Sequence, residues 1–261
     1  MTQIPGFARA EIGMVLSDGA TSKTLLIKHF ARRYVLRVDK PAARELGLQR
    51  GAEEEVLRMV AAAGLSPEPL YFDHENGIFL REFTAGTNWT VSELQNKKAL
   101  KRLADTLRVL HSLPAVNAKF EPTKAVESYA AQVGTDESRE LADKAKSALE
   151  KLESKAHVDC LCHNDLLNHN ILESEAVNLI DWEFAGMGDP LFDLATVIEH
   201  HSLPDKLVQI FLRHYLERLP VEDDLRRLAQ QRTVFNCLSE LWYLRTSTTH
   251  RPSEVIMDEW I

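Results

Sequence analysis

The chain has 261 residues, a formal net charge of -8 and 44% hydrophobic residues. This length exceeds the usual single-core domain and the hydrophobic content supports a large core, so we expect one large domain or two lobes. The acidic balance excludes a broad nucleic-acid surface, which needs an excess of lysine and arginine, and it suits a cationic small molecule as partner.

The sequence predicts a protein without a membrane segment. No apolar run approaches the roughly 20 residues that a membrane-spanning helix needs, and the first residues lack the basic start and apolar core of a signal peptide. We therefore expect a cytoplasmic location, with neither a membrane nor a nucleic acid as partner.

Three cysteines are present, and an odd number favours free thiols in a reducing compartment. Cys160 and Cys162 are only two positions apart, too close in a strand for a disulfide across its pleat. A zinc site that combined them with His163 would need a fourth ligand and a finger-like spacing, and neither is visible. We interpret the two cysteines as small core residues.

The first part of the chain has the pattern of a β-rich segment with one helix. Alternating apolar residues predict strands at 11–16, 24–30, 34–38, 67–73 and 77–83. The polar turn from Ser17 to Ser22 lies between the first two strands, where its N–H groups and hydroxyls could contact phosphates. It contains one glycine and matches no phosphate-binding motif, so as a lone feature it is an ordinary hairpin turn.

Arg37 stands out in the third strand because its neighbours are apolar. Such a cation is either an edge charge that reaches water or a phosphate contact. A helix is predicted over Leu48–Ala63, with Gly64 as its terminal glycine. Its first half carries three consecutive glutamates, residues 53–55, which favour the helix N-terminus; one of them could turn inward to meet Arg37.

A lobe boundary is predicted at Thr84–Gly86, because the segments beyond it are dominantly helical. Residues 1–83 would form a β-rich lobe, and residues 84–261 a mainly helical lobe. The predicted helices are residues 92–112, 124–132, 137–155, 190–200, 205–219 and 223–246.

The chemistry is expected in the stretch from Leu161 to Asp193. A predicted hairpin there carries Asn170 and Asp181 to the same end, with Asp165 just upstream. Phosphoryl transfer requires positioning, neutralised phosphate charge and a carboxylate near the attacking hydroxyl. Asp165 is the candidate for that carboxylate, and Asn170 and Asp181 offer hard oxygen ligands for Mg²⁺. A single polar loop residue more often caps a turn, but capping alone rarely produces this joint spacing.

The chain resembles the choline kinase, thiamine kinase and aminoglycoside phosphotransferase group in two motifs, CHNDLLNHNIL and LIDWEFAGMGDPLFDLA. They are similar to the catalytic loop and the acidic metal-binding motif of protein-kinase-like enzymes. The resemblance runs from about Met14 to the C-terminus and is most specific in these motifs. It implies an α+β, two-lobed protein-kinase-like fold, with an N-terminal antiparallel sheet lobe containing one helix and a larger, mainly helical C-terminal lobe. It also implies ATP and Mg²⁺ as cofactors, with residues 1–83 as the nucleotide-binding lobe and residues 84–261 as the catalytic and substrate-binding lobe.

The resemblance also implies roles for individual residues. Arg37 and Glu53 would form the ion pair beside the phosphates, and Asp193 would brace the catalytic loop, with His163 interpreted as structural. The residues implied to bind the nucleotide are Ser17, Gly19, Thr21, Ser22, Arg37, Glu53, Glu82 and Phe83. The chain departs from the group's pattern in having one glycine in the phosphate loop and no decisive substrate motif after residue 193.

The implied substrate is a small cationic alcohol, such as choline, ethanolamine or thiamine, phosphorylated on its primary hydroxyl by ATP. Aromatic faces backed by carboxylates hold quaternary nitrogens well, so the predicted contacts are Trp182, Glu183 and Trp242. Trp242 also has the spacing of a core residue. The alternatives are an aminoglycoside O-phosphotransferase and a nucleotide-binding pseudokinase, and the sequence leaves the oligomeric state open.

Overall fold

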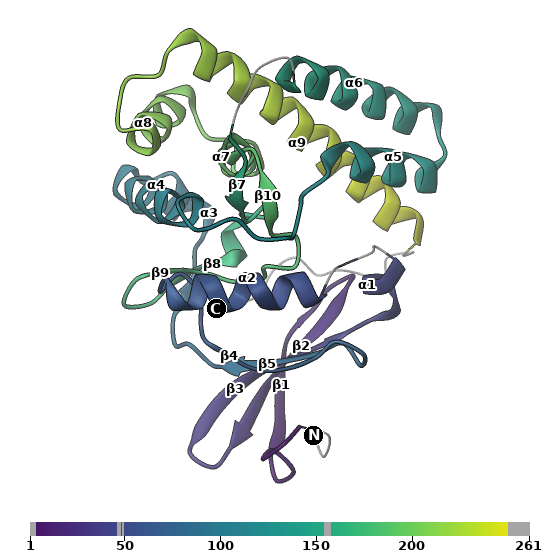
Figure 1. Cartoon of the computed structure of the whole chain (residues 1–261), viewed down its shortest axis with the longest axis vertical. Coiled ribbons are helices and arrows are strands. Elements are labelled where there is room, and N and C mark those ends of the chain that lie inside the picture. The colour runs from purple at the N-terminus through teal and green to yellow at the C-terminus, as the bar shows by residue number, and fades with distance from the viewer. Residues whose placement is uncertain (1–3, 46–47, 49, 154–157, 250–261) are drawn as a thin grey trace. The chain divides into compact units, whose positions relative to one another are not determined.

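The computed structural model describes residues 4–45, 48, 50–153 and 158–249 (Figure 1). The chain divides into two compact units. The first comprises Met1–Phe120 and His157–Glu222, and the second comprises Glu121–Ala156 and Asp223–Ile261. The β-rich segment and the catalytic stretch both belong to the first unit, so the boundary predicted between residues 83 and 84 falls inside it.

The first unit begins with an antiparallel sheet in the order β1-β2-β3-β5-β4. Its strands are β1 (Glu11–Asp18), β2 (Ser22–His29), β3 (Arg32–Asp39), β4 (Pro69–Asp73) and β5 (Ile78–Glu82). The sequence predicted all five strands, but the first turn is shorter than expected. Ser17 and Ser22 lie in strands, where they pair with Thr24 and Asp39, so the turn itself is residues 19–21.

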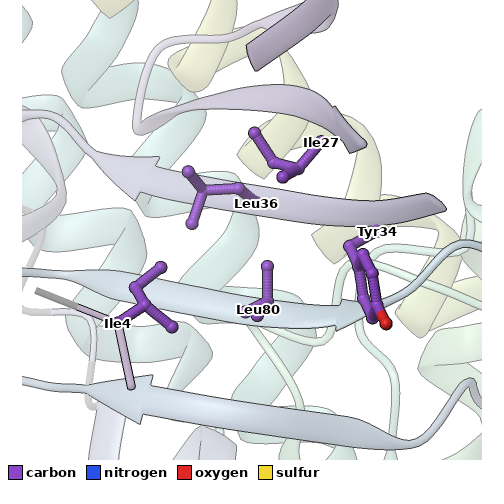
Figure 2. Close-up of a cluster of buried hydrophobic side chains, with 5 residues drawn as sticks. All are labelled: Ile4, Ile27, Tyr34, Leu36 and Leu80. Atoms are coloured by element: carbon purple, nitrogen blue, oxygen red, sulfur yellow. The ribbon is translucent and has the colours of Figure 1, made fainter. Parts of the chain in front are cut away.

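Alternate residues of the central strands build the core of this sheet. Figure 2 shows Ile27, Tyr34, Leu36 and Leu80 gathered with Ile4 in one buried cluster. Burying each large aliphatic side chain contributes roughly 1.5–3 kcal/mol, so the cluster holds the strands in register. Successive side chains of a strand point to opposite faces, which directs Arg37 away from this cluster.

Helices α1 (Pro41–Glu45) and α2 (Arg50–Ala62) connect β3 to β4. α2 buries Val56, Leu57 and Val60 at helical spacing, and Glu53 lies on the same buried stripe. The predicted helix began at Leu48; residue 49 lies outside the described residues. The helix is followed by Gly64 at φ 73°, the left-handed conformation that glycine adopts without strain and that the sequence had predicted at this end.

The prediction of a single helix over residues 92–112 is wrong, because two helices are present. α3 (Val91–Leu94) is followed by α4 (Lys97–His111). Asn96 lies between them, and its side-chain oxygen accepts a hydrogen bond from the N–H of Lys98 at 2.8 Å. Asparagine stabilises a helix N-terminus better than a helix interior, so the chain starts a new helix here.

The stretch from Leu161 to Asp193, in which the catalytic residues are predicted, is made mainly of short elements. They are β7 (Cys160–Cys162), the 3-10 turn η1 (Asn168–Asn170), β8 (Ile171–Glu173), β9 (Val177–Leu179) and β10 (Gly186–Gly188). Two longer helices follow, α7 (Pro190–His200), which contains Asp193, and α8 (Asp205–Leu216). The predicted hairpin is β8–β9, and β6 (Thr87–Asn88) joins it as a third strand. β7 pairs with β10. A strand of two or three residues is too short to show a periodic pattern, which is why β6 and β10 were not predicted.

The second unit contains α5 (Pro122–Val133), α6 (Asp136–Glu153) and most of α9 (Glu222–Thr249). α5 ends at Gly134, which has φ 74°. The three helices correspond to those predicted over residues 124–132, 137–155 and 223–246, with ends that differ by a few residues. Residues 154 and 155 of the helix predicted over 137–155 lie outside the described part of the chain. Among the described helices, none is both long and apolar enough to cross a bilayer.

Candidate active site

Asp165 and Asn170 are bound to each other in the segment between β7 and β8. The side-chain amide of Asn170 donates to the backbone oxygen of Asp165 at 2.8 Å and to Asp165 Oδ2 at 2.9 Å. Asn170 is buried, with 2% exposure, and Asp165 is half-buried. Because the amide N–H groups point to Asp165, the amide oxygen of Asn170 is the atom that remains to bind a cation.

Asp181 lies beside this pair. The N–H of Ile180 donates to the backbone oxygen of Asn170 at 2.9 Å, which fixes Asp181 next to it. Asp181 has φ 67°, a conformation that aspartate tolerates better than most residues and that recurs at functional sites. Its side chain is 45% exposed, and Asp181 Oδ1 is 4.0 Å from Arg37 Nη1. Asn170 and Asp181 thus offer the oxygen atoms that Mg²⁺ prefers.

Negative charge is crowded around Asp165. Burial, followed by the charges of Asp181 and Glu183, raises the pKa of Asp165 to about 8. A divalent cation among these carboxylates would favour their ionised forms and relieve the repulsion. Both the negative charge of the site and the oxygen atoms of Asn170 and Asp181 therefore suit a metal ion.

Asp193, on α7, holds the start of the catalytic loop. Its carboxylate accepts hydrogen bonds from the backbone N–H of His163 at 2.9 Å and of Asn164 at 2.7 Å. The ring of His111 donates to it as well, from Nε2 at 3.0 Å. Asp193 has no exposed surface, so these contacts are shielded from water. The geometry suits the bracing role predicted for Asp193.

His163 is a buried link between the loop and the strand that precedes Asp181. Its Nε2 lies 3.0 Å from the carbonyl oxygen of Ile180, so Nε2 carries the proton. Its Nδ1 then accepts from the N–H of Asp165 at 3.3 Å. Burial lowers the pKa of His163, which keeps the ring neutral. These contacts suit the structural role predicted for His163.

Arg37 and Glu53 form a two-pronged ion pair between β3 and α2. The distances are 2.5 Å from Arg37 Nη1 to Glu53 Oε1 and 2.7 Å from Arg37 Nη2 to Glu53 Oε2. Both side chains are nearly inaccessible, at 9% and 3% exposure. Burial opposes the charge of Arg37, but the attraction of Glu53 outweighs it and raises the pKa of Arg37. The predicted pairing of these two residues is therefore present.

Replacing Glu53 with alanine should lower the free energy of unfolding by roughly 3–5 kcal/mol, because it leaves a buried guanidinium without its carboxylate. Glu55→Ala is the matched control, since Glu55 is exposed on the same helix and its loss should cost less than about 1 kcal/mol. Urea unfolding of the two variants measures the difference. Equal losses would show that the buried pair contributes nothing specific.

The turn after β1 is fastened to Glu183. Thr21 Oγ1 donates to Glu183 Oε1 at 2.9 Å, and Arg50 donates to Glu183 Oε2 at 3.1 Å. Burial and the charge of Asp181 raise the pKa of Glu183 to about 7. Both oxygens of Glu183 therefore face the side predicted for the nucleotide. The substrate contact predicted for Glu183 has no support in these contacts.

The other predicted nucleotide contacts are spread over the sheet. Gly19 accepts a hydrogen bond from Lys40 Nζ at 2.5 Å through its backbone oxygen. Glu82 pairs with Arg32 on the exposed surface at 3.0 Å. The N–H of Phe83 donates to the backbone oxygen of Arg33, whose guanidinium lies 4.3 Å from the Phe83 ring centre. The role of this segment in holding adenine remains a prediction.

The two tryptophans predicted to contact substrate have different surroundings. Trp182 is 1% exposed, its ring lies 4.5 Å from the ring of His163, and its N–H donates to the backbone oxygen of Leu179 at 3.0 Å. A ring this deep has no face to offer a substrate, so the prediction for Trp182 does not fit its position. Trp242 belongs to the second unit, where its ring centre is 5.6 Å from that of Tyr129.

Sequence reasoning did not select three charged residues around the ion pair. Arg50 donates to Asp39 through two atoms, both at 2.7 Å, and to Glu53 Oε2 at 2.7 Å. Arg81 lines a cavity of about 20 Å³ together with Arg37 and Asp181, and burial lowers its pKa to about 10. Spacing could have found two of them: Asp39 is two positions from Arg37 in one strand, and Arg50 is three positions from Glu53 in one helix.

The chain matches the phosphotransferase enzyme family over residues 13–230, which is most of its length. Among curated proteins, protein LicA of Haemophilus influenzae strain Rd is 27% identical over 252 residues, with 90% of this chain and 92% of LicA covered. Among solved structures, choline kinase LicA from Streptococcus pneumoniae has a TM-score of 0.80 at 22% identity, with 94% of this chain and 89% of that chain covered.

Two further structures extend the comparison. LicA in complex with AMP has a TM-score of 0.79 at 20% identity, and 95% of this chain and 88% of that chain are covered. An aminoglycoside-3'-phosphotransferase of type VIII has a TM-score of 0.65 at 20% identity, and 91% of this chain and 96% of that chain are covered. These likenesses confirm the protein-kinase-like fold that the sequence predicted. The match over residues 13–230 goes further, and with it the chain is shown to belong to the phosphotransferase enzyme family.

Proposed function

We propose that the protein transfers the γ-phosphate of ATP, with Mg²⁺, to the primary hydroxyl of a small cationic alcohol. The observation that carries the proposal is the arrangement of Asp165, Asn170 and Asp181 beside the buried pair of Arg37 and Glu53. Membership of the phosphotransferase enzyme family supports the reaction class. Choline is favoured, with ethanolamine and thiamine as near alternatives, because the relative with the highest TM-score given above is a choline kinase.

Asn170 and Asp181 would hold Mg²⁺ through the amide oxygen and the carboxylate. Bound there with ATP, the ion would neutralise the negative charge of the phosphoryl group during its transfer to the acceptor hydroxyl. Arg37 lies 4.0 Å from Asp181 and supplies a fixed positive charge at the same place. Glu53 keeps that guanidinium in position, so the chain itself provides a preorganised site for phosphate oxygens.

Asp165 would receive the substrate hydroxyl. Asn170 fixes the Asp165 carboxylate by its 2.9 Å hydrogen bond to Oδ2, which leaves Oδ1 to orient the hydroxyl and accept its proton. Asp193 holds the backbone on the other side of the loop through His163 and Asn164. The Asp165 carboxylate and the backbone before it are therefore both held in position before substrate binds, and this lowers the free-energy cost of aligning the reactants.

A product-identified panel tests the proposal. The protein would be incubated with ATP, Mg²⁺ and each of choline, ethanolamine, thiamine and kanamycin, and each phosphorylated product would be identified by mass spectrometry. We expect phosphocholine, phosphoethanolamine or thiamine phosphate, and at least about 100-fold less product from the Asp165→Asn variant in the same time.

Three outcomes would contradict the proposal. Phosphorylation of kanamycin alone would make the protein an aminoglycoside phosphotransferase. Magnesium-dependent ATP binding without any product would make it a pseudokinase. An Asp165→Asn variant with full activity would remove Asp165 from the reaction.

A further inference from the structure

His111, Cys160 and Cys162 form a cluster of metal-binding side chains outside the site described above. One ring nitrogen of His111 and the two sulfur atoms all lie within 4.8 Å of one another. The cysteines occupy the first and third positions of β7, so their side chains point to the same face of the strand. His111 reaches them from the last residue of α4. The zinc site considered from the sequence combined the two cysteines with His163. The ring of His163 is instead hydrogen-bonded to Ile180 and Asp165, and His111 is the histidine beside the cysteines.

The sulfur separation suits a tetrahedral ion. Cys160 Sγ and Cys162 Sγ are 3.8 Å apart, and both thiols are free. Zinc binds cysteine sulfur at about 2.3 Å, and two such bonds at the tetrahedral angle place the sulfurs about 3.8 Å apart. A disulfide would require them to approach to about 2.0 Å, so the pair is unbridged, and the observed separation is one that two ligands of one ion also have.

The hydrogen bonds of His111 leave Nδ1 as the ring nitrogen that could bind an ion. The carboxylate of Asp193 can only accept, so the proton of the ring is on Nε2, 3.0 Å from Asp193 Oδ2. Nδ1 therefore keeps its lone pair, which now accepts from the hydroxyl of Tyr215 at 2.8 Å. A histidine ligand whose other ring nitrogen donates to a carboxylate is the arrangement that orients imidazole toward zinc in proteins.

We infer that His111, Cys160 and Cys162 form a Zn²⁺ site. Binding replaces the two thiol protons, which leave to solvent, by one divalent ion, so the ion and two thiolates are neutral together. The fourth tetrahedral position goes to water or to the Tyr215 hydroxyl, which is displaced from Nδ1. Cys162 is buried and Cys160 is partly exposed, which gives the ion a path from solvent.

The site is connected to the catalytic loop through one residue. Asp193 accepts from His111 with the same oxygen, Oδ2, that accepts from the N–H of His163. An ion that fixes the ring of His111 therefore also fixes the carboxylate that braces the loop. Zinc should raise the thermal midpoint of the protein, since a ligand that binds the folded state alone stabilises it.

Metal titration of the reduced, chelator-treated protein tests the inference. Zinc would be titrated in competition with a chromophoric chelator, and cadmium would be added separately to read the thiolate-to-metal charge-transfer band in the ultraviolet. We expect one equivalent of zinc and a cadmium band in the wild type. Cys160→Ser, the milder ligand change because Cys160 is partly exposed, should bind at least about 100-fold more weakly and lose most of the band.

Two control variants locate the ion. Cys237→Ser changes the remaining cysteine, which lies in the second unit, and should bind zinc as the wild type does. Asp181→Asn changes the proposed Mg²⁺ site and should also keep the cadmium band. Circular dichroism of the metal-free variants checks that each is folded.

The inference is overturned if Cys160→Ser is folded and binds zinc with wild-type affinity, or if the reduced wild type binds no zinc. It is also overturned if cadmium produces no thiolate band. A Cys160–Cys162 disulfide, detected by mass in a protein that binds no metal after reduction, would assign the pair to redox chemistry instead.

Discussion

Replacing Asp165 with asparagine should reduce turnover by at least about 100-fold while ATP still binds, because a positioned base contributes about 10²–10⁴-fold. Asparagine keeps the size of the side chain but cannot accept the proton of the substrate hydroxyl. The phosphate contacts proposed for Arg37 are unchanged by the substitution. Measured on the same preparation, turnover should therefore fall while nucleotide affinity stays near that of the wild type.

The same variant should be more stable than the wild type in the absence of metal. Burial, with the charges of Asp181 and Glu183, raises the pKa of Asp165 from 3.8 to about 8. Between these two pH values the folded state holds a proton that the unfolded state has released, so rising pH destabilises the wild type. Asparagine does not titrate, so the difference in thermal midpoint should grow as pH rises toward about 8 and then become constant.

Thermal melts with EDTA at several pH values between about 5 and 9 measure this difference. Asp136→Asn is the control, because Asp136 is 91% exposed and its removal should leave the pH profile unchanged. An Asp165→Asn variant that is both inactive and less stable at every pH would show that the loss of activity reflects damage to the fold.

Replacing Asp193 with alanine should have the largest effect on stability. It removes the acceptor of three buried donors: the N–H groups of His163 and Asn164 and the ring of His111. Each stranded donor costs roughly 1–3 kcal/mol, and the catalytic loop loses its anchor at the same time. We expect a large fall in the urea midpoint and, in the fraction that folds, a loss of turnover comparable to that of the Asp165 variant.

Asp193→Asn refines this test. Its oxygen can replace one carboxylate oxygen, but its NH2 group must face a donor, so we expect a smaller loss of stability than with alanine. Asp205→Asn, at the exposed first turn of α8, should cost less than about 1 kcal/mol. If Asp193→Ala unfolds at the same urea concentration as this control, Asp193 does not brace the loop.

The sequence predicted the elements whose pattern repeats within the element itself. The five strands are runs rich in apolar residues and bounded by turns, and the helix from Pro190 to His200 begins at a proline preceded by a capping aspartate, Asp189. Hairpin geometry also brought Asn170 and Asp181 to one end, because the connection between β8 and β9 is short and both strands are apolar.

Two other predictions did not match the structure. The helix predicted across Asn96 is broken, because a local cap competes with helical propensity and wins. The substrate contact predicted for Trp182 does not fit the burial of its ring, and the reason is different: the sequence around an aromatic residue beside such a motif is the same whether the ring faces a ligand or the core.

By itself, therefore, the sequence determined the reaction class. It also predicted that Asp165, Asn170 and Asp181 lie together, because they are joined by short segments with few ways to fold. Only the tertiary structure decided which charges surround them. Arg50 meets Glu183, and His111 meets Cys160 and Cys162, across long stretches of chain. No spacing rule links such residues, because the packing of separate strands and helices sets their distances.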